Sequence, residues 1–183
     1  MIETERLKLI PCSRAHYEAA LRNEQELAKL LGVSLAENWT QFPETMPVGY
    51  AMLKAKPENL LWGMYFFIHK NDNSLIGNGG FKGFIDENGM VEIGYALAPV
   101  YWNKGLATEA AKGMIDYAFS NANVKMVDAH TLAAVNASVR VLQKCGMTKI
   151  GEKFDTEDGD IWHWRILREE YQEKKAIGSR RKA

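Results

Sequence analysis

One stretch limits the possible folds of this chain more than any other, the sequence VEIGYALAPVYWNKGLATEAAKG from Val91 to Gly113. Its first part is apolar and typical of a buried strand, and the residues after Gly105 suit a helix. Glu92 lies near the start of the apolar part, and NKGLAT opens the helix without an ordinary capping residue. A strand that passes directly into a helix favours a sheet with helices packed on its faces.

The sequence around this unit predicts further strands and helices. Apolar residues at alternate positions indicate strands, and apolar residues at helical spacing indicate helices. Up to Leu97 we expect a strand at Arg6–Ile10 that stops at Pro11, a helix at His16–Leu31, and an antiparallel meander of strands at Trp62–His69, Leu75–Phe84 and Met90–Leu97. After it we expect a helix at Leu106–Phe119, a strand at Lys125–Leu132, a helix at Ala137–Lys144, and strands at Thr148–Asp155 and Ile161–Leu167. These elements predict a mixed sheet with helices on its faces.

The segment from Gly32 to Leu60 has no clear period. Pro43, Pro47 and Pro57 interrupt any long helix there, and only GYAMLKA suits one or two helical turns. We therefore expect this segment to be mostly irregular.

The composition excludes several classes of protein. The chain has 183 residues, of which 46% are hydrophobic and 25% charged, as in one globular domain. Lys and Arg number 23 and Asp and Glu also 23, so no global charge favours nucleic acid or a membrane surface. Cys12 and Cys145 cannot form a disulfide framework, and the first residues lack the pattern of a secretory signal. We expect a cytoplasmic protein with neither nucleic acid nor membrane as a partner.

The turn segment NKGLAT is a candidate anion site. A helix N-terminus exposes unpaired backbone N–H groups and a partial positive charge, and Gly105 lets the backbone come close to a ligand. The segment is not a Walker loop, because Lys104 precedes Gly105 and the earlier glycine of that pattern is missing. The glycines from Gly77 to Gly83 have the wrong spacing for a dinucleotide fingerprint. Taken alone, a glycine at a strand-to-helix turn is usually only a turn.

Two motifs that follow each other along the chain favour the anion site over an ordinary turn. EIGYALAPVYWNKGLATEA, followed by VNASVRVLQKCGM, resembles the GNAT superfamily of acyl-CoA-dependent N-acetyltransferases, most closely the branch of ribosomal-protein N-terminal (Rim-type) acetyltransferases. The resemblance covers about Glu3 to Leu167. It implies a single-domain α/β (α+β mixed) fold, with a mostly antiparallel sheet of about six or seven strands, splayed at its centre and covered by helices on both faces. We expect the N-acetyltransferase domain to span residues 1–170 and a charged C-terminal tail to span residues 171–183.

The resemblance implies acetyl-CoA as the acetyl donor. The family's pyrophosphate turn has Gln or Arg, two residues, Gly, one residue, then Gly or Ala, and these places hold Trp102, Gly105 and Ala107. Trp102 departs from the usual polar residue, but binding at this turn depends mainly on backbone donors. The cofactor-binding residues implied at the turn are Trp102, Asn103, Lys104, Gly105, Leu106, Ala107 and Thr108.

The resemblance also implies where the pantetheine arm binds. The strand ending at Tyr95, Ala96 and Leu97 is expected to splay away from its parallel neighbour and leave backbone groups free for the pantetheine amides. Asn136 corresponds to the family's asparagine that bonds this arm. It also suits the N-cap of the helix at Ala137–Lys144, and both roles can hold together.

Glu92 is the candidate general base. A carboxylate in a central strand loses solvation unless it faces a wet cleft or a partner, so pairing with a nearby Lys is one interpretation. The other is catalytic, in which partial burial raises the pKa of Glu92 toward working pH and helps it take a proton from an amine. The match to the family's glutamate favours the catalytic interpretation.

The general acid is less well specified. The family's frequent tyrosine, four residues before Gly146, is Leu142 here, and Ser138 is the alternative near the thiol sulfur, although a serine in the first turn of a helix is commonly structural. A departing thiolate has a pKa near 8.5 and can take its proton from water. We expect Cys145 to be a structural thiol and, because the four histidines are scattered, no metal site.

The acceptor is open between several classes. We expect a primary amine, with a protein or peptide α-amino group preferred, and a small amine such as a polyamine, amino acid or drug as the alternative. A non-catalytic acyl-CoA-binding module is the rival from another class. Trp39, Phe42 and Tyr50 lie where the family builds its acceptor wall, and either a monomer or a homodimer is compatible with the sequence.

Overall fold

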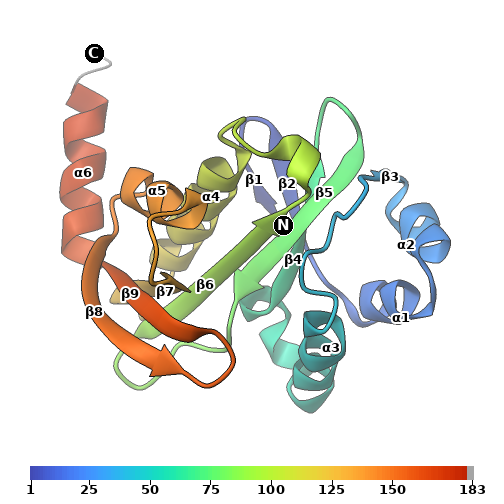
Figure 1. Cartoon of the computed structure of the whole chain (residues 1–183), viewed down its shortest axis with the longest axis horizontal. Helices are drawn as coiled ribbons and strands as arrows, with labels where there is room; N and C mark the ends of the chain where they lie inside the picture. Colours follow the sequence, from blue (N-terminus) through green and yellow to red (C-terminus); the bar gives the residue numbers. More distant parts are fainter. Residues whose placement is uncertain (181–183) are drawn as a thin grey trace.

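A mixed sheet of nine strands carries helices on both faces (Figure 1). The computed structural model describes residues 1–180. The strands are β1 (Ile2–Glu3), β2 (Leu7–Pro11), β3 (Ser34–Leu35), β4 (Met64–His69), β5 (Ser74–Phe81), β6 (Met90–Leu97), β7 (Met126–Leu132), β8 (Thr148–Asp155) and β9 (Gly159–Leu167). The α-helices are α1 (Arg14–Arg22), α2 (Glu24–Leu31), α3 (Thr45–Ala55), α4 (Leu106–Ser120), α5 (Ala137–Lys144) and α6 (Arg168–Arg180), with short 3₁₀ turns η1 (Pro57–Trp62) and η2 (Pro99–Tyr101).

The strand order confirms the expected fold class. The strands follow the order β1-β2-β4-β5-β6-β7-β9-β8, and β3 pairs with β5. The β6–β7 and β3–β5 pairs are parallel, and the other pairs are antiparallel. The seven strands expected from the sequence are all present. β1 and β3 were not expected, because two residues are too few to show a period.

Two expectations for the helices were wrong. The expected helix His16–Leu31 is two helices, because Asn23 is extended at φ −171° and ψ 161° and its side chain accepts a hydrogen bond from Glu26 N–H as the N-cap of α2. The apolar spacing continues across this break and hides it. The helix α3 has 11 residues rather than one or two turns, since Pro47 lies in its first turn, where a missing N–H costs nothing.

The core consists of two clusters separated by the sheet. Along β4, Tyr65 and Phe67 face the cluster that contains α4, whereas Phe66 and Ile68 face the cluster that contains α1, α2 and α3. All four side chains are buried. This alternation follows from the period of two in a strand, and it explains why β4 reads as one continuous apolar run.

The sheet opens between β6 and β7, as expected. Their parallel register runs from the Met90–Met126 pair to the Glu92–Asp128 pair. Beyond Glu92, β6 stays paired with β5 as far as Leu97, while β7 stays paired with β9 as far as Leu132. The two strands therefore diverge, and α4 packs against β6 while α5 packs against β7, with the two helices side by side on the same face of the sheet (Figure 1).

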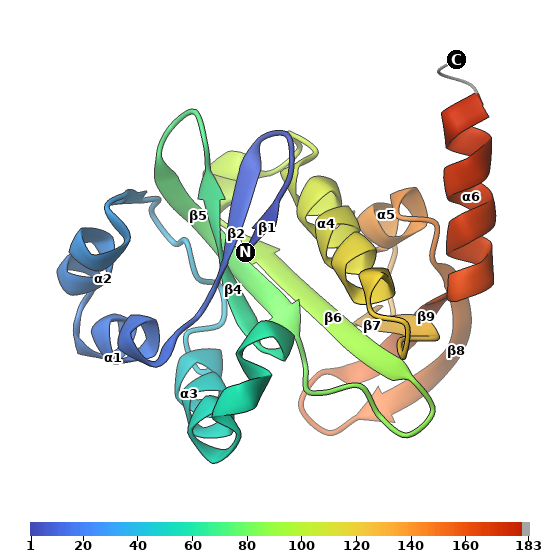
Figure 2. The ribbon, with the colours of Figure 1, turned by 180° about the vertical axis from the view of Figure 1, so that it is seen from behind.

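The C-terminal helix α6 follows β9 directly and stands at one end of the molecule (Figure 2). The guanidinium of Arg168 donates hydrogen bonds to the carbonyls of Phe119, Asn121 and Val124. The expected tail at residues 171–183 is helical as far as Arg180, and residues 181–183 lie outside the described part of the chain. The domain boundary at residue 170 stays a prediction.

No helix within residues 1–180 is both long enough and apolar enough to cross a membrane.

Candidate active site

The turn between β6 and α4 has the backbone of an anion site. Asn103 and Gly105 both have left-handed backbone conformations, with φ 59° and φ 78°. Gly105 is the N-cap of α4, and no side chain within the described residues caps the first turn of that helix. The N–H groups of this turn are therefore available to a ligand, and a residue with a Cβ at position 105 would be strained. An anionic diphosphate fits such a turn.

Trp102, the residue that departs from the family pattern, folds back onto the strand. Its indole Nε1 donates a hydrogen bond of 2.7 Å to the carbonyl of Leu97, while the residue remains 54% exposed. Trp102 thus fastens the turn to the end of β6 through its own side chain.

The backbone of β6 at the opening differs in part from the expectation. Lys82 N–H donates to Glu92 O, and Ala98 N–H donates to Ile76 O. In an antiparallel ladder every second residue turns its backbone N–H and C=O groups toward the same neighbouring strand, so these two bonds show which residues of β6 face β5. By this alternation Ala96 turns its backbone groups toward β5, so the expectation that it offers a free group is corrected. Tyr95 and Leu97 turn theirs toward the opening. Trp102 already donates to the carbonyl of Leu97, so within residues 1–180 the groups left turned toward the opening are both backbone groups of Tyr95 and the N–H of Leu97.

The first turn of α5 meets β6 across the opening. The side-chain Oδ1 of Asn136 accepts a hydrogen bond of 3.0 Å from Val139 N–H, which confirms its N-cap role. The hydroxyl of Tyr95 donates a hydrogen bond of 3.4 Å to the carbonyl of Ser138. Tyr95, Asn136 and Ser138 therefore lie together at this end of the opening. Leu142 is buried in the core, where the family's tyrosine would otherwise stand.

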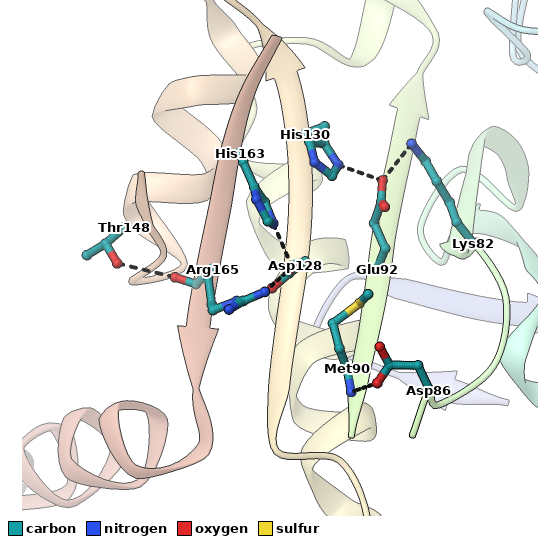
Figure 3. Close-up of polar contacts among 9 residues, drawn as sticks. All are labelled: Lys82, Asp86, Met90, Glu92, Asp128, His130, Thr148, His163 and Arg165. Carbon is teal, nitrogen blue, oxygen red and sulfur yellow. Dashed lines mark hydrogen bonds and ion pairs between the residues drawn. The ribbon is translucent and has the colours of Figure 1, made fainter. Parts of the chain in front are cut away.

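Glu92 lies on the sheet face opposite α4, because its neighbours Val91 and Ile93 face the α4 cluster. Its Oε1 lies 2.9 Å from Lys82 Nζ and 3.0 Å from His130 Nδ1 (Figure 3). Its side chain is 21% exposed. The pairing with a nearby lysine that the sequence left open is therefore present.

The pKa of Glu92 corrects one expectation. Burial raises the pKa of this carboxyl, as expected, but the hydrogen bonds and charges of Lys82 and His130 outweigh burial, so the net pKa is lowered. Glu92 is therefore an ionised carboxylate at neutral pH. Because a carboxylate only accepts hydrogen bonds, Nδ1 of His130 carries the proton that it donates.

A second carboxylate network lies beside Glu92, and sequence reasoning missed it. Asp128 pairs with Glu92 in the β6–β7 register, and its side chain accepts hydrogen bonds from Arg165 at 2.7 and 2.7 Å and from His163 Nε2 at 2.6 Å (Figure 3). The rings of His130 and His163 stack with centroids 4.6 Å apart. Asp128 and His130 are two residues apart on one strand, which is a signal in the sequence, but only the strand pairing brings His163 and Arg165 to them.

The remaining candidates have structural surroundings. Burial raises the pKa of the Cys145 thiol to about 12, which suits a structural thiol. Trp39 is buried and donates its indole N–H to Glu24, and the hydroxyl of Tyr50 donates to Glu18. Phe42 is exposed. Within residues 1–180 no three His, Cys, Asp or Glu side chains lie together so as to hold a metal ion.

Comparisons with known proteins agree on one family. Residues 6–148 match the family model described as an acetyltransferase (GNAT) domain. The uncharacterized N-acetyltransferase YjdG of Bacillus subtilis is 29% identical over 166 residues, which cover 90% of this chain and 96% of YjdG.

Two solved structures have the same fold. RimL, the ribosomal L7/L12 α-N-protein acetyltransferase in complex with coenzyme A, is 14% identical, with a TM-score of 0.66 over 90% of this chain and 95% of that one. Mutant forms of the spermidine/spermine N-acetyltransferase SpeG from Vibrio cholerae are 16% identical, with a TM-score of 0.67 over 94% of this chain and 99% of that one.

The Asp128 network predicts a pH-dependent stability. Burial raises the pKa of Asp128, but Arg165 and His163 outweigh it, so the folded pKa lies below the usual value. Such a group contributes stability above the unfolded pKa of about 3.9, and this contribution is lost as the pH falls through the folded value. We expect Asp128→Asn to lower the free energy of unfolding at pH 7 by about 3 kcal/mol and to flatten its fall below pH 4. Urea denaturation at several pH values measures both. The exposed Asp158→Asn is the control, and an equal effect of the two substitutions would contradict the prediction.

Proposed function

The chain belongs to the GNAT acetyltransferase family, and from this premise we propose that it acetylates a peptide or protein α-amino group, with Glu92 as the base. It is an N-acetyltransferase that uses acetyl-CoA as the donor. The observation that carries the proposal is the position of Glu92, an ionised carboxylate at the last residue pair before β6 and β7 diverge. The proposal keeps the cytoplasmic location expected from the sequence.

The turn and the opening would hold the donor. The first-turn N–H groups of α4, from Leu106 onward, would bind the diphosphate, and Gly105 would allow close approach. The free backbone groups of Tyr95 and the N–H of Leu97 would bind the pantetheine amides. The side-chain amide of Asn136 would contribute its N–H₂ group, since its Oδ1 already caps α5.

Glu92 would accept the proton of the attacking amine, directly or through one water. Acetyl-CoA supplies the thioester, whose C–S bond breaks as the new C–N bond forms. A lowered pKa makes Glu92 a weaker base, but it also keeps the carboxylate ionised at every working pH. Ser138 or water would give a proton to the departing thiolate. The residual proton on Glu92 then passes readily to solvent, because the carboxyl is a strong acid relative to water.

Lys82 favours an acceptor with a single amine. Its ammonium lies 2.9 Å from Glu92 Oε1 and is largely exposed. Because Lys82 already pairs with Glu92, the base offers little net negative charge to attract an acceptor with several ammonium groups, such as a polyamine. This pairing supports the α-amine over the polyamine, which is the second candidate because of the fold shared with SpeG.

The first prediction from this proposal concerns the donor turn. Gly105→Glu adds a side chain at a left-handed position and a negative charge beside the diphosphate, so we expect it to abolish binding of acetyl-CoA. Isothermal titration calorimetry measures the affinity. Gly151→Ala is the matched control, since Gly151 has open space around it and no positive φ. Wild-type affinity in a folded Gly105→Glu variant would contradict the anion site.

The second prediction concerns the base. Glu92→Gln keeps the shape of the side chain but removes its ability to take a proton, so we expect kcat to fall by about 10²-fold or more. Affinity for acetyl-CoA should change little, because Glu92 lies on the opposite sheet face from α4. Thiol release measures turnover, and the exposed Glu87→Gln is the control. A turnover within two-fold of the wild type would exclude Glu92 as the base.

The third prediction concerns the acceptor. An attacking amine must be neutral, and an α-amino group has a pKa near 8, whereas a lysine side chain has a pKa near 10.4. Freeing the lysine lone pair at neutral pH therefore costs roughly 3 kcal/mol more. We expect a peptide with a free N-terminus to be acetylated faster than a blocked peptide with one lysine, and faster than spermidine.

Mass spectrometry locates the acetyl group in each peptide. Faster reaction of the blocked lysine peptide would contradict the α-amine preference. Turnover of spermidine with neither peptide reacting would make the polyamine the acceptor class instead.

A further inference from the structure

Arg6 joins the N-terminal segment to the donor turn. It lies between β1 and β2, which pack beside α4 (Figure 2). Its guanidinium Nη1 donates a hydrogen bond of 2.9 Å to the carbonyl of Lys104, the residue directly before Gly105. Its Nε donates a hydrogen bond of 2.7 Å to Glu109 Oε2. One side chain therefore contacts both the turn and the first turn of the helix that follows.

The contact with Lys104 fixes the orientation of one peptide group. In a trans peptide the C=O and N–H groups point in opposite directions, and the described residues contain no cis peptide. Because the carbonyl of Lys104 points to Arg6, the N–H of Gly105 points away from it. Gly105 has φ 78°, and a glycine backbone has more conformational freedom than that of other residues. The hydrogen bond from Arg6 therefore restricts a peptide group that would otherwise be able to rotate.

Glu109 is a negative charge close to the proposed anion site. It lies in the first turn of α4, and its side chain is only 16% exposed. It accepts three hydrogen bonds, from the Thr4 hydroxyl at 2.6 Å and from the backbone N–H and Nε of Arg6 at 2.7 Å each. Burial raises the pKa of Glu109, but these partners outweigh it, so the carboxyl is ionised. Without compensation, this charge would repel a diphosphate at the same helix end.

We propose that Arg6 and Glu109 are positioning residues for the donor site, where Arg6 holds the Lys104–Gly105 peptide in its binding orientation and neutralises Glu109. Glu109 in turn holds Arg6 and the segment from Thr4 to Arg6 against α4. Neither residue needs to contact the reacting atoms. The proposal rests on the proposed role of the turn as the diphosphate site.

The proposal makes a double-mutant prediction. Arg6→Ala should raise the Kd of CoA about ten-fold, because it releases the turn and leaves the charge of Glu109 uncompensated. Adding Glu109→Gln to Arg6→Ala removes that charge and should recover at least about three-fold of the lost affinity. Arg22→Ala breaks an exposed ion pair with Glu26 far from the turn and is the matched control. Calorimetry with CoA measures all three variants.

A second donor separates positioning of the turn from a general loss of structure. S-acetylpantetheine lacks the diphosphate, so Arg6→Ala should change its kcat/KM by less than about two-fold while lowering that of acetyl-CoA about ten-fold. Equal losses with both donors would overturn the proposal, as would unchanged CoA affinity in Arg6→Ala. A double variant that binds CoA no better than Arg6→Ala would also overturn it.

Two further variants distinguish failure of the positioning role of Arg6 from failure of the proposed donor site. If Arg6→Ala does not fold, Arg6→Lys serves, because a lysine keeps the charge but cannot hold Lys104 and Glu109 together in the geometry of a guanidinium. Wild-type CoA affinity in Arg6→Lys would overturn the role of the Lys104 contact. Gly105→Glu tests the turn itself. If Gly105→Glu abolishes binding and Arg6→Ala does not weaken it, the positioning role fails and the proposed donor site stands.

Discussion

The divergence of β6 from β7 is the constraint on which the rest of the site depends. The two strands pair over only three residues, and then each keeps its other neighbour. Glycines on β5 allow β6 to stay paired with β5 at close range. A Cβ at Gly77 would lie 2.3 Å from the carbonyl oxygen of Ala96, and a Cβ at Gly79 would lie 2.4 Å from the carbonyl oxygen of Gly94. Side chains at these positions would force the strands apart. β5 and β6 therefore approach closely on the side of β6 away from the opening, and β6 stays with β5 where it leaves β7.

The end of this short parallel pairing places two carboxylates side by side. Glu92 and Asp128 are partners in the register, and like charges on neighbouring strands destabilise a sheet unless each is compensated. Lys82 and His130 compensate Glu92, and Arg165 and His163 compensate Asp128. This compensation explains why the pKa of each carboxyl is lowered although burial alone would raise it. The base we propose thus depends on fixed charge pairing rather than on a raised pKa.

The sequence predicted the elements well and the side-chain networks poorly, for physical reasons. Strand and helix periods are local, so the seven longer strands and α5 could be placed, whereas the break at Asn23 is hidden because the apolar spacing runs through it. Gly105 could be singled out because a left-handed turn has its own residue preference. The stacking of His130 on His163 depends on the β7–β9 register, which no local pattern contains. The same is true of Ala96, whose backbone direction depends on the ladder with β5.

Helix α4 is held at both ends by arginines from the two ends of the domain. Arg6 binds Glu109 and the turn at its N-terminus, and Arg168 donates to the carbonyls of Phe119, Asn121 and Val124 at and just beyond its C-terminus. A cation at the C-terminal end of a helix is favourable, whereas a cation at the N-terminal end is not, so Arg6 needs Glu109 as a partner there. This difference explains why the N-terminal arginine is paired with a largely buried carboxylate, whereas the C-terminal one donates its hydrogen bonds to carbonyls. These contacts hold both ends of α4, and in the donor role that we propose for its first turn, such preorganisation would reduce the entropy lost on binding.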